Sequence, residues 1–168
     1  MKLNVKTIAA QAMIAAVYTG LTLLLAPVGF GPWQMRAAEA LTLLPFINPM
    51  CIIGVTVGCA LSNIIGSGNV LDMIFGPLAT LLAAFLTSRA KNVWIAAIPP
   101  VVINALVIGA VLAYALEGAF GALFPLFALQ IGAGQAVACF GLGIPLVGLM
   151  KRYTAVAQDG GFVWKKTK

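Results

Sequence analysis

Thr7-Ile-Ala-Ala-Gln-Ala-Met-Ile-Ala-Ala-Val-Tyr-Thr-Gly-Leu-Thr-Leu-Leu-Leu-Ala26 contains no charged residue and follows the basic residues Lys2 and Lys6. A basic start before an apolar run is also typical of a secretory signal peptide, whose apolar core has about 7 to 15 residues. This segment is longer, and its length is close to the roughly 20 apolar residues that cross a bilayer as one helix. We therefore expect a first membrane span over residues 7–26 that is retained in the mature protein.

The composition of the whole chain indicates a membrane protein. Of its 168 residues, 62% are hydrophobic and 8% are charged, and the mean hydropathy is +1.06. A water-soluble domain needs a larger share of polar residues to cover its surface. We expect an all-α integral membrane protein with one domain over residues 1–168.

Gly, Pro, Asn and charged residues divide the apolar sequence into six predicted spans, over residues 7–26, 35–47, 50–66, 71–88, 93–114 and 123–150. The second span is short and contains Pro45, which favours a partial or tilted helix supported by its neighbours.

The basic residues predict the topology of these spans. Nine of the ten fall on one side of a six-span arrangement, as the positive-inside rule requires of the cytoplasmic side. Both termini, including the tail over residues 151–168, are therefore predicted to be cytoplasmic. The nine are Lys2, Lys6, Arg89, Lys91, Lys151, Arg152, Lys165, Lys166 and Lys168.

Arg36 and Glu39 interrupt an otherwise apolar stretch at the predicted outer end of the second span, and Asp72 opens the fourth span. Charges inside a bilayer cost about 2.5 to 3.5 kcal/mol each on insertion scales, and they usually face a bundle interior or a water-filled cavity. We expect an outward-facing pocket here. The same outer layer contains Phe30, Trp33, Asn63, Asn69 and Gln130.

Structural roles compete with ligand binding at these positions. Arg36 and Glu39 are three residues apart, and on a shared helix face they would form an internal ion pair. Asp72 could serve only as a helix cap. Glu117 lies in a Gly-rich turn, where a solvated side chain is expected. Asn104, deep in the fifth span, fits an interhelical hydrogen bond as well as a ligand contact.

The sixth and first spans each carry a further pattern. In the sixth, Gln130 and Gln135 flank two glycines that permit close packing or a kink, and either amide could reach a pocket. In the first, Ala12, Ala16 and Gly20 form a stripe of small residues that lets another helix approach closely. That helix could belong to this bundle or to a partner.

Several classes of protein are disfavoured by what the sequence lacks. It has no histidine, no GxxxxGK[ST] loop and no GxSxG motif, so we expect no enzyme, no cofactor and no ATP hydrolysis by this chain. Cys51, Cys59 and Cys139 have neither metal-ligand nor disulfide-framework spacing, and we expect buried thiols and no metal site. The basic residues lie at the ends of the predicted spans and do not form one basic face, so we expect no nucleic-acid partner.

Two separated segments carry a resemblance to a known family. They are Gln34-Met-Arg36-Ala-Ala-Glu39-Ala-Leu-Thr-Leu-Leu-Pro45 and Asp72-Met-Ile-Phe-Gly76-Pro-Leu-Ala-Thr80-Leu-Leu-Ala-Ala84. In this order they resemble the queuosine-precursor transporter (QueT) family, substrate-binding S components of energy-coupling factor (ECF) transporters. The resemblance covers nearly the whole membrane region.

The resemblance implies a six-helix subunit in the bacterial plasma membrane that captures a deazaguanine outside the cell. Its partners would be a transmembrane coupling protein and two cytoplasmic ATPases. The stripe of Ala12, Ala16 and Gly20 would meet the coupling protein, and the loop over residues 27–35 would act as a lid. The expected substrate-binding residues are Trp33, Gln34, Arg36, Glu39, Asn63, Asp72, Asn104, Gln130 and Gln135.

A guanine-like edge offers neighbouring N–H donors to one carboxylate, and its carbonyl accepts from Gln, Asn or Arg. Charge-assisted hydrogen bonds of this kind are about twice as strong as neutral ones. Glu39 and Asp72 are the leading acids, and the flat ring could stack on Phe30 or Trp33. The family often has an acid near Gln135, which would bind the ammonium of the aminomethyl form. Because Gln135 is neutral, the cyano precursor and the free base remain alternative ligands to the aminomethyl form.

Three other functions fit the sequence. The first is the same architecture with another vitamin-like substrate. The second is a proton-coupled secondary carrier, in which Glu39 or Asp72 exchanges protons. The third is a structural or assembly protein of the membrane, whose polar residues only hold helices together.

Overall fold

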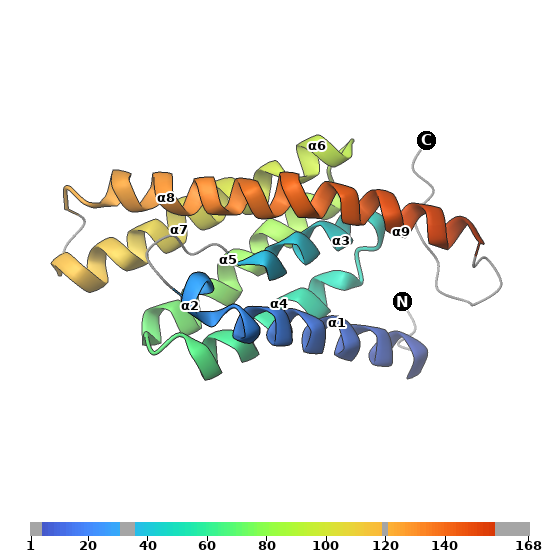
Figure 1. Ribbon diagram of the computed structural model, residues 1–168, viewed down its shortest axis with the longest axis horizontal. Helices are drawn as coiled ribbons and strands as arrows, with labels where there is room; N and C mark the ends of the chain where they lie inside the picture. Colours follow the sequence, from blue (N-terminus) through green and yellow to red (C-terminus); the bar gives the residue numbers. More distant parts are fainter. Residues whose placement is uncertain (1–4, 31–35, 119–120, 157–168) are drawn as a thin grey trace.

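The computed structural model describes residues 5–30, 36–118 and 121–156, and the regular structure in these ranges is entirely helical (Figure 1). A 3-10 helix, η1, leads into α3, and a π-helix, η2, joins α8 to α9. The bounds are α1 Val5–Leu24, α2 Ala26–Gly29, η1 Ala37–Leu43, α3 Leu44–Ile47, α4 Cys51–Gly66, α5 Val70–Ser88, α6 Val93–Ala96, α7 Ile98–Glu117, α8 Phe124–Ala136, η2 Val137–Gly143 and α9 Ile144–Val156.

Six apolar helical segments correspond to the six predicted spans. Four are long and apolar enough to cross a membrane, by length and composition: Val5–Leu24, Val70–Ser88, Val93–Glu117 and Phe124–Arg152. Two are shorter, Ala37–Ile47 and Cys51–Gly66. The prediction of an all-helical protein is confirmed. The number of crossings and the cytoplasmic side of the termini stay predictions.

Three boundaries differ from the prediction. The loop expected over residues 27–35 begins inside α2, because Pro27 stands in the first helical turn, where its missing N–H breaks no hydrogen bond. The fifth segment continues past residue 114 to Glu117 and ends at Gly118, whose φ of 68° is left-handed. The last segment continues past residue 150 to Val156.

The short second segment lies at the centre of the fold. η1 and α3 contact α1, α4, α5, α9 and η2. The side chains of Leu43, Leu44, Phe46 and Ile47 are buried, and three of them pack in a core that includes Cys139. A helix surrounded in this way does not need the length to cross a bilayer alone. The predicted support by neighbouring helices is confirmed.

The longer helices pack around this centre in chain order. α1 packs on α4, α4 on α5, α5 on α7, and α7 on α8 (Figure 1). Glycine permits the closest approach. A Cβ atom added at Gly58 of α4 would lie 2.7 Å from the Cβ atom of Tyr18 in α1, and one at Gly109 of α7 would lie 3.0 Å from the backbone of Ala128 in α8. Small residues at such crossings let two helix backbones meet.

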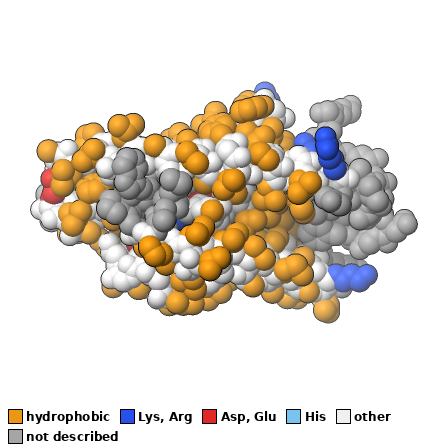
Figure 2. All heavy atoms as spheres, in the orientation of Figure 1, with side chains coloured by type: hydrophobic (Ala, Val, Ile, Leu, Met, Phe, Trp, Pro, Cys, Tyr) orange, Lys and Arg blue, Asp and Glu red, His pale blue; other side chains and the backbone are white. Residues whose placement is uncertain are grey.

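The surface of the bundle is mainly apolar. Large hydrophobic side chains such as Ile64, Leu78 and Leu129 are exposed, and Figure 2 shows a face dominated by hydrophobic atoms. α1 starts and α9 finishes at the same end of the bundle (Figure 1), and the large basic groups of Figure 2 lie toward that end. This distribution suits a bundle with lipid around its middle.

Candidate functional site

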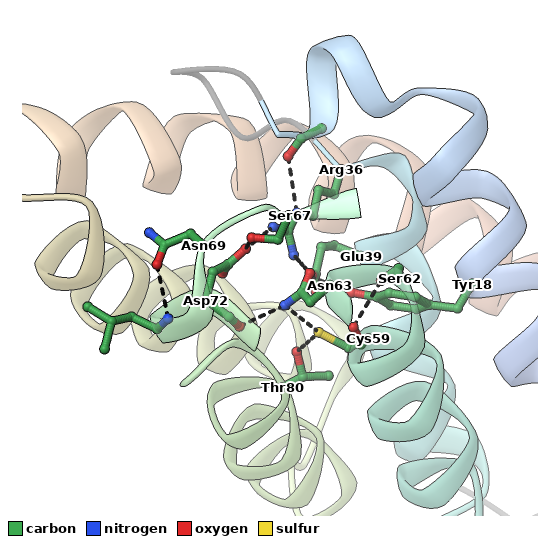
Figure 3. Close-up of polar contacts among 12 residues, drawn as sticks. Tyr18, Arg36, Glu39, Cys59, Ser62, Asn63, Ser67, Asn69, Asp72 and Thr80 are labelled. Atoms are coloured by element: carbon green, nitrogen blue, oxygen red, sulfur yellow. Dashed lines mark hydrogen bonds and ion pairs between the residues drawn. The ribbon is translucent and has the colours of Figure 1, made fainter. Parts of the chain in front are cut away.

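Arg36 is the centre of a buried polar cluster near the start of η1. It is the residue before this helix, with an extended backbone at φ −98° and ψ 104°, and it is 4% exposed. Its Nη2 donates to Asp72 Oδ2 at 2.9 Å, its Nη1 to Asn63 Oδ1 at 2.9 Å and its Nε to the carbonyl of Gly29 at 3.1 Å (Figure 3). The guanidinium therefore joins η1 to α2, α4 and α5.

The predicted ion pair between Arg36 and Glu39 is wrong. In the described part of the chain, the salt bridge of Arg36 is with Asp72, whose side chain is 2% exposed. The i, i+3 argument holds for two residues inside one helix, whereas Arg36 lies before η1 in extended backbone. The side chain is thereby directed across the bundle.

Asp72 is more than a helix cap. The capping residue of α5 is Asn69, whose Oδ1 accepts from the backbone N–H of Leu71 at 2.9 Å. The Oδ2 atom of Asp72 accepts from Arg36 and from the hydroxyl of Ser67 at 2.8 Å. The alternative of a cap alone is therefore wrong.

Asn63 locks the cluster to the backbone of α5. It accepts from Arg36, and its Nδ2 donates to the carbonyl oxygen of Asp72 at 3.0 Å. Gly76, one turn further along α5, leaves room for this amide, because an added Cβ would collide with Asn63 Nδ2. Both ends of the Asn63 side chain are thus in use.

Glu39 forms a second, adjacent part of the site. Its side chain is 2% exposed, and its Oε1 accepts from the hydroxyl of Tyr18 in α1 at 2.7 Å. Its backbone carbonyl accepts from the Thr42 hydroxyl at 2.6 Å, and Cys139 Sγ of η2 lies 3.8 Å from the same oxygen. The amide of Gln135, 3% exposed at the end of α8, lies beside the Glu39 carboxyl and acts on it as a hydrogen-bonding group.

Four of the predicted site residues have a buried polar atom without a hydrogen-bonding partner among the described residues. Such an atom costs about 1 to 3 kcal/mol in a folded protein, and native structures contain few of them. A ligand or an ordered water is the kind of group that satisfies such an atom. The four atoms are Glu39 Oε2, Asp72 Oδ1, Asn104 Nδ2 and Gln130 Oε1.

The structure brings together only part of the predicted set. Arg36, Asn63 and Asp72 form one hydrogen-bonded cluster, whereas Asn104 of α7 and Gln130 of α8 share no hydrogen bond with it in the described ranges. Phe30 stacks on the guanidinium, with Arg36 Cζ 4.7 Å from the ring centroid. Trp33 and Gln34 lie outside the described residues.

Two contributors to the site were missed by the sequence analysis. Tyr18 donates to Glu39, and Ser67 donates to Asp72. For Tyr18 there was a signal: a phenol in the middle of an apolar span needs a buried partner for its hydroxyl. For Ser67 there was none, because the partner is set by the turn before α5.

The small-residue stripe lies on the outside of the bundle. Ala12, Ala16 and Gly20 are all exposed, and a Cβ added at Gly20 would meet no atom within 4 Å. α1 packs on its neighbours with the opposite face, which carries Gln11, Ala15, Tyr18 and Thr22. The alternative of packing within this chain is therefore wrong for the stripe, and its contact with a coupling protein stays a prediction.

The amino-acid sequence was compared with known proteins, protein families and solved structures. A protein from Lactococcus lactis subsp. cremoris (strain MG1363), named "Queuosine precursor transporter QueT", is 40% identical over 87 residues. That alignment covers 48% of this chain and 51% of the relative, so it spans about half the length of that protein. No solved structure matches the chain. The family model described as "QueT transporter" matches residues 8–152. Since this match includes all six apolar helical segments nearly in full, the chain belongs to the QueT transporter family.

Proposed function

We propose that this chain is the substrate-binding subunit of an ATP-driven ECF-type importer and that it takes up a queuosine precursor, a deazaguanine, across the bacterial plasma membrane. Membership of the QueT transporter family supports the transport role, and the name of the Lactococcus lactis relative supports the substrate class.

The unpaired Oε2 atom of Glu39 carries the proposal. A carboxylate accepts about four hydrogen bonds through its two oxygens, and among the described residues Tyr18 donates to Oε1 while Oε2 has no donor within hydrogen-bonding distance. The adjacent N–H donors of a guanine-like edge match this unused capacity. A buried acid without such a ligand would carry the full penalty of an unsatisfied group.

Asp72 and Arg36 play a different part in the proposed site. Their charges largely offset each other, so the cluster adds a rigid polar wall with one open acceptor, Asp72 Oδ1. This acceptor suits the cationic ammonium of the aminomethyl form. The unpaired Nδ2 of Asn104 is a donor of the kind that the ligand carbonyl requires.

Energy for transport would come from partners. The exposed stripe of Ala12, Ala16 and Gly20 is the proposed surface for the transmembrane coupling protein, since small residues let two helices approach closely. Two cytoplasmic ATPases complete the proposed complex.

Binding to the purified full chain tests the proposal. Calorimetry with aminomethyl-, cyano- and unmodified deazaguanine should show selective binding to the wild type. Glu39→Gln keeps the shape of the side chain and replaces one acceptor oxygen by an N–H donor, so it should abolish binding. Glu117→Gln changes an exposed acid at the end of α7 and serves as the matched control.

If no deazaguanine binds to the wild type, the substrate assignment is wrong. If the chain alone carries out proton-driven uptake in proteoliposomes, it is a secondary carrier and the proposal of an importer subunit is wrong.

A further inference from the structure

Tyr18 is a fully buried phenol in the middle of α1. Its exposed fraction is 0%, and it packs in a core cluster with Ala38, Val55, Cys59 and Ala84. Its hydroxyl reaches Glu39 Oε1 at 2.7 Å, across 21 positions of sequence. This distance falls in the range of strong O–H···O bonds to a carboxylate. Figure 3 shows the ring extending from α1 toward Glu39.

The position of this hydroxyl is fixed by the backbone of α1. Gly58 of α4 lies so close that an added Cβ would be 2.7 Å from Tyr18 Cβ. The hydroxyl of Thr19 donates to the carbonyl of Gly58 at 3.1 Å, and that of Thr22 donates to the carbonyl of Tyr18 at 2.9 Å. The phenol ring therefore enters the core from a helix that is held in place on both sides of it.

The other strong donor near Glu39 points elsewhere. Within the described residues, the three hydrogen bonds of the Arg36 guanidinium go to Gly29, Asn63 and Asp72. In the described ranges, Tyr18 is the side chain whose hydrogen bond to the Glu39 carboxyl is short and well formed. Oε1 therefore retains one acceptor position beside the Tyr18 bond, and Oε2 retains both of its own for a ligand. A neutral hydroxyl orients the carboxyl without neutralising it.

We propose that Tyr18 is a positioning residue for ligand recognition: through its bond to Oε1 it sets the rotation of the Glu39 carboxyl so that both oxygens meet a ligand's paired N–H donors. This role rests on the proposed function. It makes α1 part of the site, although no residue of α1 other than Tyr18 donates to Glu39 among the described contacts.

Tyr18→Phe removes the hydroxyl and retains the ring in the core. Loss of the hydrogen bond that orients the carboxyl should weaken binding of a guanine-edged deazaguanine by about tenfold to a hundredfold. A second readout is selectivity. A ligand of the hypoxanthine type, which lacks the exocyclic amine, uses one N–H fewer, so Tyr18→Phe should reduce the wild type's preference for the guanine edge. A packing defect alone would weaken both ligands alike.

The decisive experiment is a double-mutant cycle on the full chain in detergent, with unmodified deazaguanine and its hypoxanthine-type analogue as titrants. The variants are Tyr18→Phe, Glu39→Asp and the two combined. The Asp side chain keeps the charge but withdraws it from the phenol, so the effect of Tyr18→Phe should largely disappear in the Glu39→Asp background. Thr87→Val removes the hydrogen bond of another buried hydroxyl, to the carbonyl of Ala96, without touching α1 or Glu39, and it should bind like the wild type.

The possible failures are distinguishable. If the wild type binds and Tyr18→Phe binds equally well with unchanged selectivity, the role of Tyr18 is wrong and the proposed function stands. Additive effects in the cycle also contradict the role. If the wild type binds neither ligand, the proposed function fails, and the role of Tyr18 in recognition fails with it.

Discussion

Arg36 and Asp72 form an ion pair, with Nη2 and Oδ2 2.9 Å apart, between two side chains that are 4% and 2% exposed. The pair joins the start of η1 to the first turn of α5, and Asn63 of α4 is hydrogen-bonded to both residues. Three helical segments are thus held together by one polar contact network. A buried network of this kind is stable only while its members satisfy one another.

Removing one member of the pair should destabilise the protein strongly. Asp72→Asn leaves the Arg36 charge without its counter-ion in a buried site, a change that typically costs about 3 to 5 kcal/mol. Thermal unfolding in detergent measures the loss. Glu117→Gln, at an exposed acid, should unfold like the wild type. Equal stability of Asp72→Asn and the wild type would contradict the importance of the pair.

Asn63 and Asn104 should respond in opposite ways to the same substitution. Asn63→Leu leaves a guanidinium N–H of Arg36 unpaired, and we expect a loss of about 1 to 3 kcal/mol. Asn104→Leu removes an amide whose Nδ2 has no partner in the described ranges, so stability should hold or rise while ligand binding weakens. Unfolding and calorimetry on both variants provide the comparison. A large loss of stability in Asn104→Leu would show that this amide is structural.

Close packing of α1 on α4 should make Gly58 sensitive to one methyl group. Gly58→Ala places a Cβ 2.7 Å from Tyr18 Cβ and 3.0 Å from the carbonyl oxygen of Ala15, so the two helices must separate, at a cost of about 1 to 3 kcal/mol. Gly20→Ala is the matched control, because an added Cβ meets nothing within 4 Å. Unfolding temperatures should fall for the first variant alone.

The stripe on α1 should matter for transport and not for ligand binding. Ala16→Trp adds bulk to an exposed position, so the isolated chain should bind its ligand as before, whereas uptake by the proposed importer and co-purification with the proposed coupling protein should fall. Leu82→Trp, on the exposed face of α5, tests for a general effect of bulk at the surface. Normal uptake by Ala16→Trp would remove the stripe from the proposed interface.

The helices were predictable because the hydropathy of each long segment is the sum of many apolar residues that follow one another in the sequence. Each long segment has enough apolar residues to be recognised by hydropathy alone, and Pro45 together with the brevity of the second segment indicated its supported position. The π-helix η2 was not predicted, since its sequence from Val137 to Gly143 reads as ordinary apolar helix.

Six of the predicted polar residues are buried in the bundle, but how they pair was not predicted, and their role in binding stays a prediction: Arg36, Glu39, Asn63, Asp72, Asn104 and Gln135. A charge in an apolar stretch is visible in the sequence, whereas its partner depends on how distant segments meet. Arg36 and Glu39 suggested a local pair, yet Arg36 lies in extended backbone and reaches Asp72, 36 positions away. For Tyr18, its place in an apolar span indicates that the hydroxyl needs a buried partner, but not that this partner is Glu39, 21 positions away.

α1 has two faces with separate contents. Its buried face carries the hydroxyl that holds Glu39, and its exposed face carries Ala12, Ala16 and Gly20. A neighbour that docks on the exposed face and shifts the helix would therefore shift the phenol as well. Thermodynamic reciprocity then requires that ligand binding alter the affinity for that neighbour by the same factor by which the neighbour alters ligand affinity. A change at the occupied ligand site would then reach the exposed face of α1 through the movement of this one helix, without the transfer of any charge.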